Sequence, residues 1–272
     1  RAAGPLSVAA RAARDPLIIQ SLARGLAMLE DLILAEQPLR LRDFAARYGI
    51  DRAAAFRFLA TLEGFGVAQK DAESRAWSGG SRLVGWLAAA GGRLRLVEVV
   101  RPFVAELARE TGHSGHTAVL SGGQALLVDY VASPAMVTVR NRVGVHEPLY
   151  CTAVGKALLA WMPEPERERL VGRTRFERHT ARTLTGPEAL RAELARVRRD
   201  GVAVDDGEYN ELLTCLAAPL LGPNGEALGS LGISLVRSLI PRAPRHLRQL
   251  MSAVRGCGEL ASSALAGRGA GR

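Results

Sequence analysis

The chain has 272 residues, with 36 Lys and Arg, 27 Asp and Glu, and a formal net charge of +9. This length suits two domains that each bury a core. Hydrophobic residues make up 48% and charged residues 23%, which excludes a disordered or collagen-like chain. No apolar run approaches the roughly 20 residues of a membrane span, and residues 1–16 lack a signal-peptide core. We therefore expect a cytoplasmic protein without membrane contact.

Charge is unevenly distributed along the chain. Residues 1–90 hold 12 Lys and Arg against 9 Asp and Glu, residues 91–236 hold 17 of each, and residues 237–272 hold 7 against 1. A weakly basic head before a neutral centre is compatible with a small DNA-reading module joined to a domain with another task. Charge alone does not establish DNA binding.

The sequence predicts three helices at the start of the N-terminal domain. Ser21 is the expected N-cap of the first, Gly49 suits the C-terminal end of the second, and Asp51 suits the N-cap of the third. The third helix is amphipathic, and its predicted outward face carries small residues and arginines that can enter a major groove. These candidate DNA-reading residues are Arg52, Ala53, Ala54 and Arg57.

A short hairpin follows, with strands over 67–70 and 76–78 around a polar turn. Two short helices joined by a tight turn and followed by such a wing predict a winged helix-turn-helix over residues 17–80. A three-helix interaction bundle without DNA binding is the alternative. Candidate phosphate contacts are Ser21, Arg24, Arg42, Lys70 and Arg75.

The rest of the chain mixes helices and strands. Residues 81–96 predict a linker helix, and residues 97–266 a second domain, so the fold class is α+β. The expected helices of the second domain cover 97–111, 152–161, 163–170, 187–200 and 245–264. The expected strands cover 116–120, 125–131, 136–140, 202–204, 215–220 and 227–235.

Several segments together carry a family resemblance. In chain order they read SLARGLAMLE, YCTAVGKALLAW, FERHTARTLT, LRAELARVRRDGVAVDDGEY and CLAAPLLGPNGEALGSLGIS. With the helix-turn-helix, they make the chain similar to the IclR family of bacterial transcription regulators over about residues 20–260. The resemblance implies a winged helix, a linker helix and a GAF-like effector-binding domain. It also implies a dimer or a dimer of dimers bound to a palindromic operator.

The resemblance further implies a ligand cup in the second domain. Its residues here are Ala153, Gly155, Asp205 or Asp206, Cys215 and Ser234. Thr152 opens a helix whose first amides suit a carboxylate, although Thr152 is equally able to cap that helix without a ligand. The chain departs from the family at Leu212 and Gly232, where Gly and Ser are usual, so no known ligand is transferred. We expect an organic or aromatic acid as the effector and no further cofactor.

Enzymatic activity is the competing class. A hydrolase would use Cys151 or Cys215 with His116 or His146. Neither cysteine lies in a recognisable nucleophile setting. The His113 and His116 spacing is a weak metal signal, and no metal is expected. The three cysteines form no CxxC pair and are most simply reduced thiols. The sequence favours a transcription regulator without enzymatic activity, and we expect a repressor.

Overall fold

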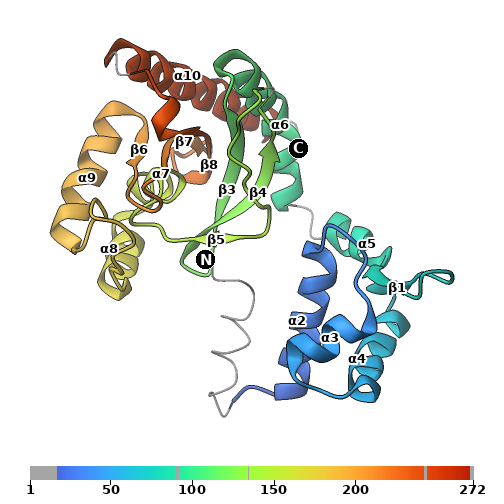
Figure 1. The fold of residues 1–272 in the computed structure, drawn as a ribbon. Coiled ribbons are helices and arrows are strands. Elements are labelled where there is room, and N and C mark those ends of the chain that lie inside the picture. The colour runs from blue at the N-terminus through green and yellow to red at the C-terminus, as the bar shows by residue number, and fades with distance from the viewer. Residues whose placement is uncertain (1–16, 90–91, 134, 242–243, 270–272) are drawn as a thin grey trace. The chain divides into compact units, whose positions relative to one another are not determined.

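The computed structural model describes residues 17–89, 92–133, 135–241 and 244–269. The chain divides into two compact units, with the division between residues 94 and 95 (Figure 1). Within the described ranges, none of the helices is both long and apolar enough to cross a bilayer.

The N-terminal unit contains the predicted three helices and hairpin. Its elements are α2 (Gln20–Leu34), α3 (Leu41–Tyr48), α4 (Arg52–Gly64), β1 (Ala68–Lys70), β2 (Trp77–Gly79) and α5 (Arg82–Ala89). The strands β1 and β2 pair antiparallel, and an isolated bridge joins Leu39 to Trp77. This arrangement is a winged helix-turn-helix.

Two of the three predicted helix ends are confirmed. Gly49 ends α3 with φ 60 in the left-handed region, which glycine adopts without strain. The Asp51 side chain accepts a hydrogen bond from the Ala54 amide at 2.7 Å and so caps α4. The prediction for Ser21 is wrong, because α2 begins one residue earlier and its N-cap, Ile19, makes no side-chain cap bond.

The core of the N-terminal unit forms where α2, α3, α4 and the wing meet. Met28, Phe44, Leu59 and Trp77 are buried there. Asp31 of α2 is also buried, and its carboxylate accepts a hydrogen bond from the Tyr48 hydroxyl at 2.7 Å. This bond joins α2 to the end of α3 and fixes the helix that precedes the turn.

The C-terminal unit is built on one antiparallel sheet. Its helices are α6 (Gly92–Thr111), α7 (Ala153–Ala160), α8 (Glu164–Arg173), α9 (Pro187–Asp200), η1 (Arg237–Leu239) and α10 (Pro244–Gly269). Its strands are β3 (Ser114–Ser121), β4 (Gln124–Val131), β5 (His146–Glu147), β6 (Ala203–Asp206), β7 (Leu213–Leu221) and β8 (Ala227–Val236). Their order across the sheet is β5-β4-β3-β8-β7-β6.

Helices cover both faces of this sheet. Because side chains alternate along a strand, Leu216 and Ile233 pack with α6 and α10, while Ala118 and Ala217 pack with α7 and α9. Figure 1 shows α10 and α9 on opposite sides of the sheet. The helix α7 contacts β3, β4, β6, β7 and β8, so the sheet curls around it.

Two predictions for this unit are wrong. Residues 136–140 form no strand, because Met136 and Val137 are exposed and the edge of β4 pairs with β5 instead. The apolar residues of this loop therefore bury no face of a sheet. The helix expected from residue 97 begins at Gly92. The limits predicted for the helix over 187–200 are those of α9.

Candidate functional site

The helix α4 presents the predicted DNA-reading face. Arg52, Ala53 and Arg57 are exposed and Ala54 is partly buried, whereas Ala55 on the opposite face is buried in the core. The Asp51 cap fixes the N-terminal end of this helix. In a helix-turn-helix, the second helix carries the base contacts, so the exposed face of α4 is the candidate DNA-reading surface.

The wing holds an aromatic and basic cluster. The Lys70 ammonium group lies 5.4 Å from the ring centroid of Phe56 and 5.5 Å from that of Trp77. The Phe56 and Trp77 rings meet edge to face at 6.4 Å. Phe56 lies on α4 beside Arg57, is exposed, and was not identified from the sequence. Arg75, in the turn of the wing, adopts φ 56.

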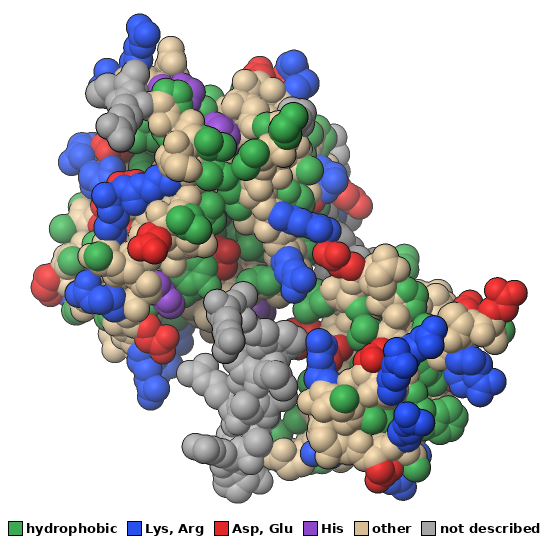
Figure 2. Space-filling model, viewed as in Figure 1, with side chains coloured by type: hydrophobic (Ala, Val, Ile, Leu, Met, Phe, Trp, Pro, Cys, Tyr) green, Lys and Arg blue, Asp and Glu red, His purple; other side chains and the backbone are tan. Residues whose placement is uncertain are grey.

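The other predicted phosphate contacts are on the surface of the same unit. Ser21, Arg24 and Arg42 are exposed, and Arg42 lies 3.7 Å from Asp43. Figure 2 shows basic side chains over the visible face of this unit, interspersed with a few acidic ones. The geometry is compatible with phosphate contacts along the duplex.

A cavity of about 200 Å³ lies in the C-terminal unit, at the first turn of α7. It is lined by residues of β3, β5, β6, β7, β8 and the loop before β5. Both edge strands of the sheet, β5 and β6, reach it because the sheet curls. Of the predicted effector residues, the cavity brings together Thr152, Ala153, Asp205, Cys215 and Ser234.

The strand register explains why distant residues meet on the cavity wall. Cys215 of β7 pairs with Ser234 of β8, and His116 of β3 pairs with Gly232, two residues before Ser234. All three side chains occupy the strand positions that face α7. Their convergence follows from the alternation of side chains in an antiparallel sheet.

Hydrogen bonds join Asn141 to two of the side chains on this cavity wall. The Asn141 side-chain amide donates to the Ser234 hydroxyl at 3.1 Å and to Nδ1 of His116 at 3.3 Å. Burial lowers the pKa of His116 to about 4, so the ring is neutral at pH 7. Since Nδ1 accepts from Asn141 in this arrangement, Nε2 carries the ring hydrogen.

The two adjacent aspartates differ sharply. Asp205 is buried and lines the cavity, and its Oδ1 accepts hydrogen bonds from the amides of Glu208 at 2.6 Å and Tyr209 at 3.4 Å. Burial raises the pKa of Asp205 to about 6. Asp206 faces the other way and pairs with Arg182 and Arg237. Asp205 is therefore the cavity residue of the pair.

Gly155 serves the packing of α7. Its amide donates to Thr152 Oγ1 at 3.2 Å, which caps the helix. A Cβ at Gly155 would lie 2.5 Å from Leu149 Cα, so the glycine permits close backbone approach. It is not a lining residue. Within the described residues, the amides of Ala153 and Val154 have no backbone partner and lie where the cavity meets the helix.

Glu147 is a cavity residue that sequence reasoning missed. It lies on the short strand β5 and lines the cavity opposite the β6 edge. Burial and the nearby Asp205 raise the pKa of Glu147 to about 7. Asn141 was missed for a different reason, because it lies in a loop with no periodic pattern. His116 also lines the cavity, whereas its sequence context indicated only a metal ligand or a catalytic base.

The thiols do not form a nucleophilic centre. Burial raises the pKa of both Cys151 and Cys215 far above the usual value, and only the thiolate is a strong nucleophile. The Cys215 thiol donates to Ser234 Oγ at 3.5 Å. His146, proposed as a hydrolase partner, is exposed on β5. In the described ranges, no three His, Cys, Asp or Glu residues are grouped to hold a metal.

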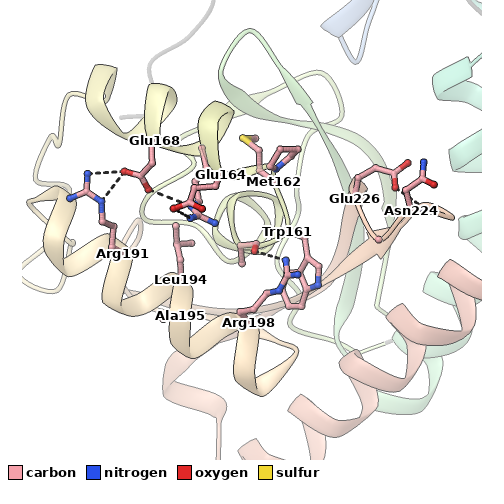
Figure 3. A pocket seen from close by; sticks show the side chains of 14 residues that line it. Trp161, Met162, Glu164, Glu168, Arg191, Leu194, Ala195, Arg198, Asn224 and Glu226 are labelled. Atoms are coloured by element: carbon pink, nitrogen blue, oxygen red, sulfur yellow. Dashed lines mark hydrogen bonds and ion pairs between the residues drawn. The ribbon is translucent and has the colours of Figure 1, made fainter.

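A larger hollow of about 850 Å³ lies beside α8, α9 and the turn before β8 (Figure 3). Its charged groups satisfy one another. Arg191 pairs with Glu168 at 2.8 Å, and the Arg198 guanidinium lies 5.2 Å from the Trp161 ring centroid while donating to a main-chain carbonyl. Such paired side chains are typical of a solvated surface.

Comparison with known proteins identifies the family. Residues 88–263 match the family described as "Bacterial transcriptional regulator IclR C-terminal", and residues 21–72 match the "IclR helix-turn-helix domain". The chain belongs to the IclR family. This IclR-family protein is therefore a DNA-binding transcription regulator and not an enzyme.

Relatives agree with this assignment, and a solved structure shares the fold. The HTH-type transcriptional regulator Rv1719 of Mycobacterium tuberculosis is 37% identical, covering 76% of this chain and 79% of the relative. BhcR of Paracoccus denitrificans is 32% identical, covering 82% and 79%. An IclR homolog from Microbacterium hydrocarbonoxydans, complexed with 4-hydroxybenzoate, shares the fold, with a TM-score of 0.74, 21% identity and coverage of 90% and 98%.

Proposed function

We propose that this IclR-family regulator is a cytoplasmic repressor that leaves its operator, or binds it differently, when an organic or aromatic acid occupies the cavity at α7. Residues 17–80 read DNA, residues 81–96 link the domains, and residues 97–266 bind the effector and oligomerise. The observation that carries this proposal is the cavity itself, which gathers Thr152, Ala153, Asp205, Cys215 and Ser234.

DNA recognition in this proposal centres on α4. Arg52 and Arg57 contact base edges or phosphates, with Ala53 and Ala54 allowing close approach to the groove. Ser21, Arg24, Arg42, Lys70 and Arg75 hold the phosphate backbone. Their exposure, or for Lys70 its place on the wing, supports these roles.

A homodimer or a dimer of dimers on a palindromic operator is part of the proposal. Leu22, Leu26 and Ile33 follow one another along a face of α2 and are 58%, 56% and 52% exposed. An apolar stripe on a small unit supports contact with a second protein surface. Two paired heads would then match two half-sites.

The effector is proposed to be an acid because α7 offers the open amides of Ala153 and Val154 at its positive end. The 4-hydroxybenzoate complex of the Microbacterium homolog supports the same class of ligand. Binding would shift the arrangement of the paired heads, and so the operator affinity, through a coupling free energy between the two sites.

A mobility-shift titration on the upstream intergenic DNA tests the proposal, at fixed salt because phosphate contacts dominate affinity. We expect a specific shift that one organic acid weakens. Arg57→Ala should lose the shift, whereas the control Arg199→Ala, an exposed arginine of α9 in the other unit, should keep it. A shift that every acid leaves unchanged would remove the effector role, and an unchanged shift with Arg57→Ala would remove α4 as the reading helix.

A further inference from the structure

The lining of the cavity at α7 carries charges of both signs, because Asp205 and Glu147 are acidic and Arg140, in the loop before β5, is basic. Asp205, 4% exposed, reaches it from β6, and Glu147 reaches it from β5, the opposite edge of the sheet. The two acidic side chains repel a carboxylate on a ligand and attract an ammonium group, while Arg140 attracts the carboxylate. The lining therefore favours a ligand that carries charges of both signs.

Both carboxylates have unused acceptor capacity. Oδ1 of Asp205 accepts two amide hydrogen bonds, but within the described residues Oδ2 has no partner. In the same part of the chain, no side chain donates to the Glu147 carboxylate or pairs with it. A carboxylate oxygen without a protein partner can accept a hydrogen bond from a donor on a ligand or pair with a cation on it. The free oxygens of these two carboxylates therefore fit a positively charged group on the ligand.

The same cavity also offers hydrogen-bond donors. The open amides of Ala153 and Val154 lie at the positive end of α7, and the neutral ring of His116 presents Nε2 as a donor. These groups suit a carboxylate. The cavity thus provides acceptors for a cation and donors for an anion within about 200 Å³, roughly the liquid volume of seven waters.

We propose that the effector of this regulator is a small zwitterion, an α-amino acid or a close analogue, whose ammonium group is held by Glu147 and Asp205 and whose carboxylate is held at the N-terminus of α7. This inference rests on the proposed effector role of the cavity and narrows its chemical class. The small volume favours a ligand of about ten non-hydrogen atoms or fewer, since each atom at liquid density takes a large part of a water volume.

Matched ligand series test the inference. Each probe is an amino acid of at most ten non-hydrogen atoms, compared at equal concentration with the 2-hydroxy acid and the unsubstituted acid of the same skeleton: alanine with lactate and propionate, and valine with 2-hydroxyisovalerate and isovalerate, extended to the remaining small amino acids. Thermal unfolding of the full chain at pH 7.5 gives the first readout, because a ligand that binds the folded state raises Tm. Titration calorimetry then gives Kd.

We expect at least one amino acid to raise Tm and to bind at least tenfold more tightly than its unsubstituted partner. Glu147→Gln should weaken that amino acid at least tenfold while weakening the unsubstituted acid little. The control Glu164→Gln changes a glutamate of α8 whose side chain is 79% exposed and should leave both affinities unchanged.

The inference is overturned by tighter binding of the unsubstituted acids, by a Glu147→Gln protein that keeps the preference for the amino acid, or by no Tm change with any probe. The mobility shift separates this failure from failure of the proposed function. If an acid without an amino group releases the operator, the cavity remains an effector site and the zwitterion inference falls.

Discussion

Replacing Lys156 tests the buried charge network beneath the cavity. Lys156 of α7 is fully buried, and its ammonium group donates to the carboxylates of Glu193 and Glu208 and to the Val204 carbonyl. Lys156→Met keeps the apolar stem and removes the charge. Glu193 retains Arg196 at 2.7 Å, but Glu208 is 9% exposed and loses its cation.

The expected magnitude follows from this burial. Removing one partner of a buried pair costs about 3–5 kcal/mol. Since Glu193 keeps a cation, we expect the free energy of unfolding of the C-terminal unit to fall by about 3 kcal/mol at pH 8. Oε2 of Glu208 already has no partner within the described residues, so the variant leaves this carboxylate without a compensating contact.

The loss of stability in Lys156→Met should become smaller as the pH falls. Burial raises the pKa of Glu208 to about 7, and Lys156 opposes that rise. Without Lys156 the folded-state pKa rises further above the ordinary value of 4.5, so the folded variant takes up a proton that the unfolded chain does not. A raised folded-state pKa adds stability as the pH falls through it. The variant therefore approaches the wild type between pH 8 and pH 6.

Urea unfolding followed by hydrogen exchange measures the effect, because exchange in peptides of the C-terminal unit reports its opening separately from the N-terminal unit. The double variant Lys156→Met, Glu208→Gln is the control. It should recover part of the lost free energy of unfolding, because it removes the negative charge that Lys156→Met leaves unpaired at Glu208. The reasoning is refuted if the free energy of unfolding of Lys156→Met lies within about 1 kcal/mol of the wild type at pH 8. It is also refuted if the loss of stability does not change with pH.

Three further predictions concern single side chains. Glu147→Gln should raise the free energy of unfolding by about 2 kcal/mol at pH 8 and by less than about 1 kcal/mol at pH 5. The reason is that the pKa of Glu147 in the folded protein is about 7, so the wild type loses stability as the pH rises. A gain in urea titrations that does not change with pH would contradict this prediction. Gly155→Ala should lower the free energy of unfolding by about 1–3 kcal/mol, because the added Cβ would meet the backbone before α7. In the same assay the control Gly172→Ala should cause no loss, because this position of α8 faces open space. Tyr48→Phe should lower the free energy of unfolding of the N-terminal unit by about 1–2 kcal/mol, because it removes the hydrogen bond to buried Asp31. Hydrogen exchange in α2 that stays as slow as in the wild type would disprove this prediction.

Local features of the fold were predictable from the sequence. The caps Gly49 and Asp51 stand beside helical apolar patterns, and the structure confirms both. The limits of α9 follow from Pro187 at its start and Gly201 at its end, where the left-handed conformation favours glycine. Each signal acts over a few residues, so it requires no knowledge of the tertiary structure. The error at Ser21 came from the same local reasoning, since α2 begins without a side-chain cap.

The composition of the cavity required the tertiary structure. Asp205 and Asp206 are neighbours in the sequence, and only the pairing of β6 with β7 decides that Asp205 faces the cavity. Glu147 comes from the far edge of the sheet and meets Asp205 because the sheet curls around α7. The sequence by itself determined the family and most of the helices and strands, but β5 was not predicted and residues 136–140 form no strand. Which side chains face one another depends on register and on curvature, and these arise from packing between segments far apart in the chain.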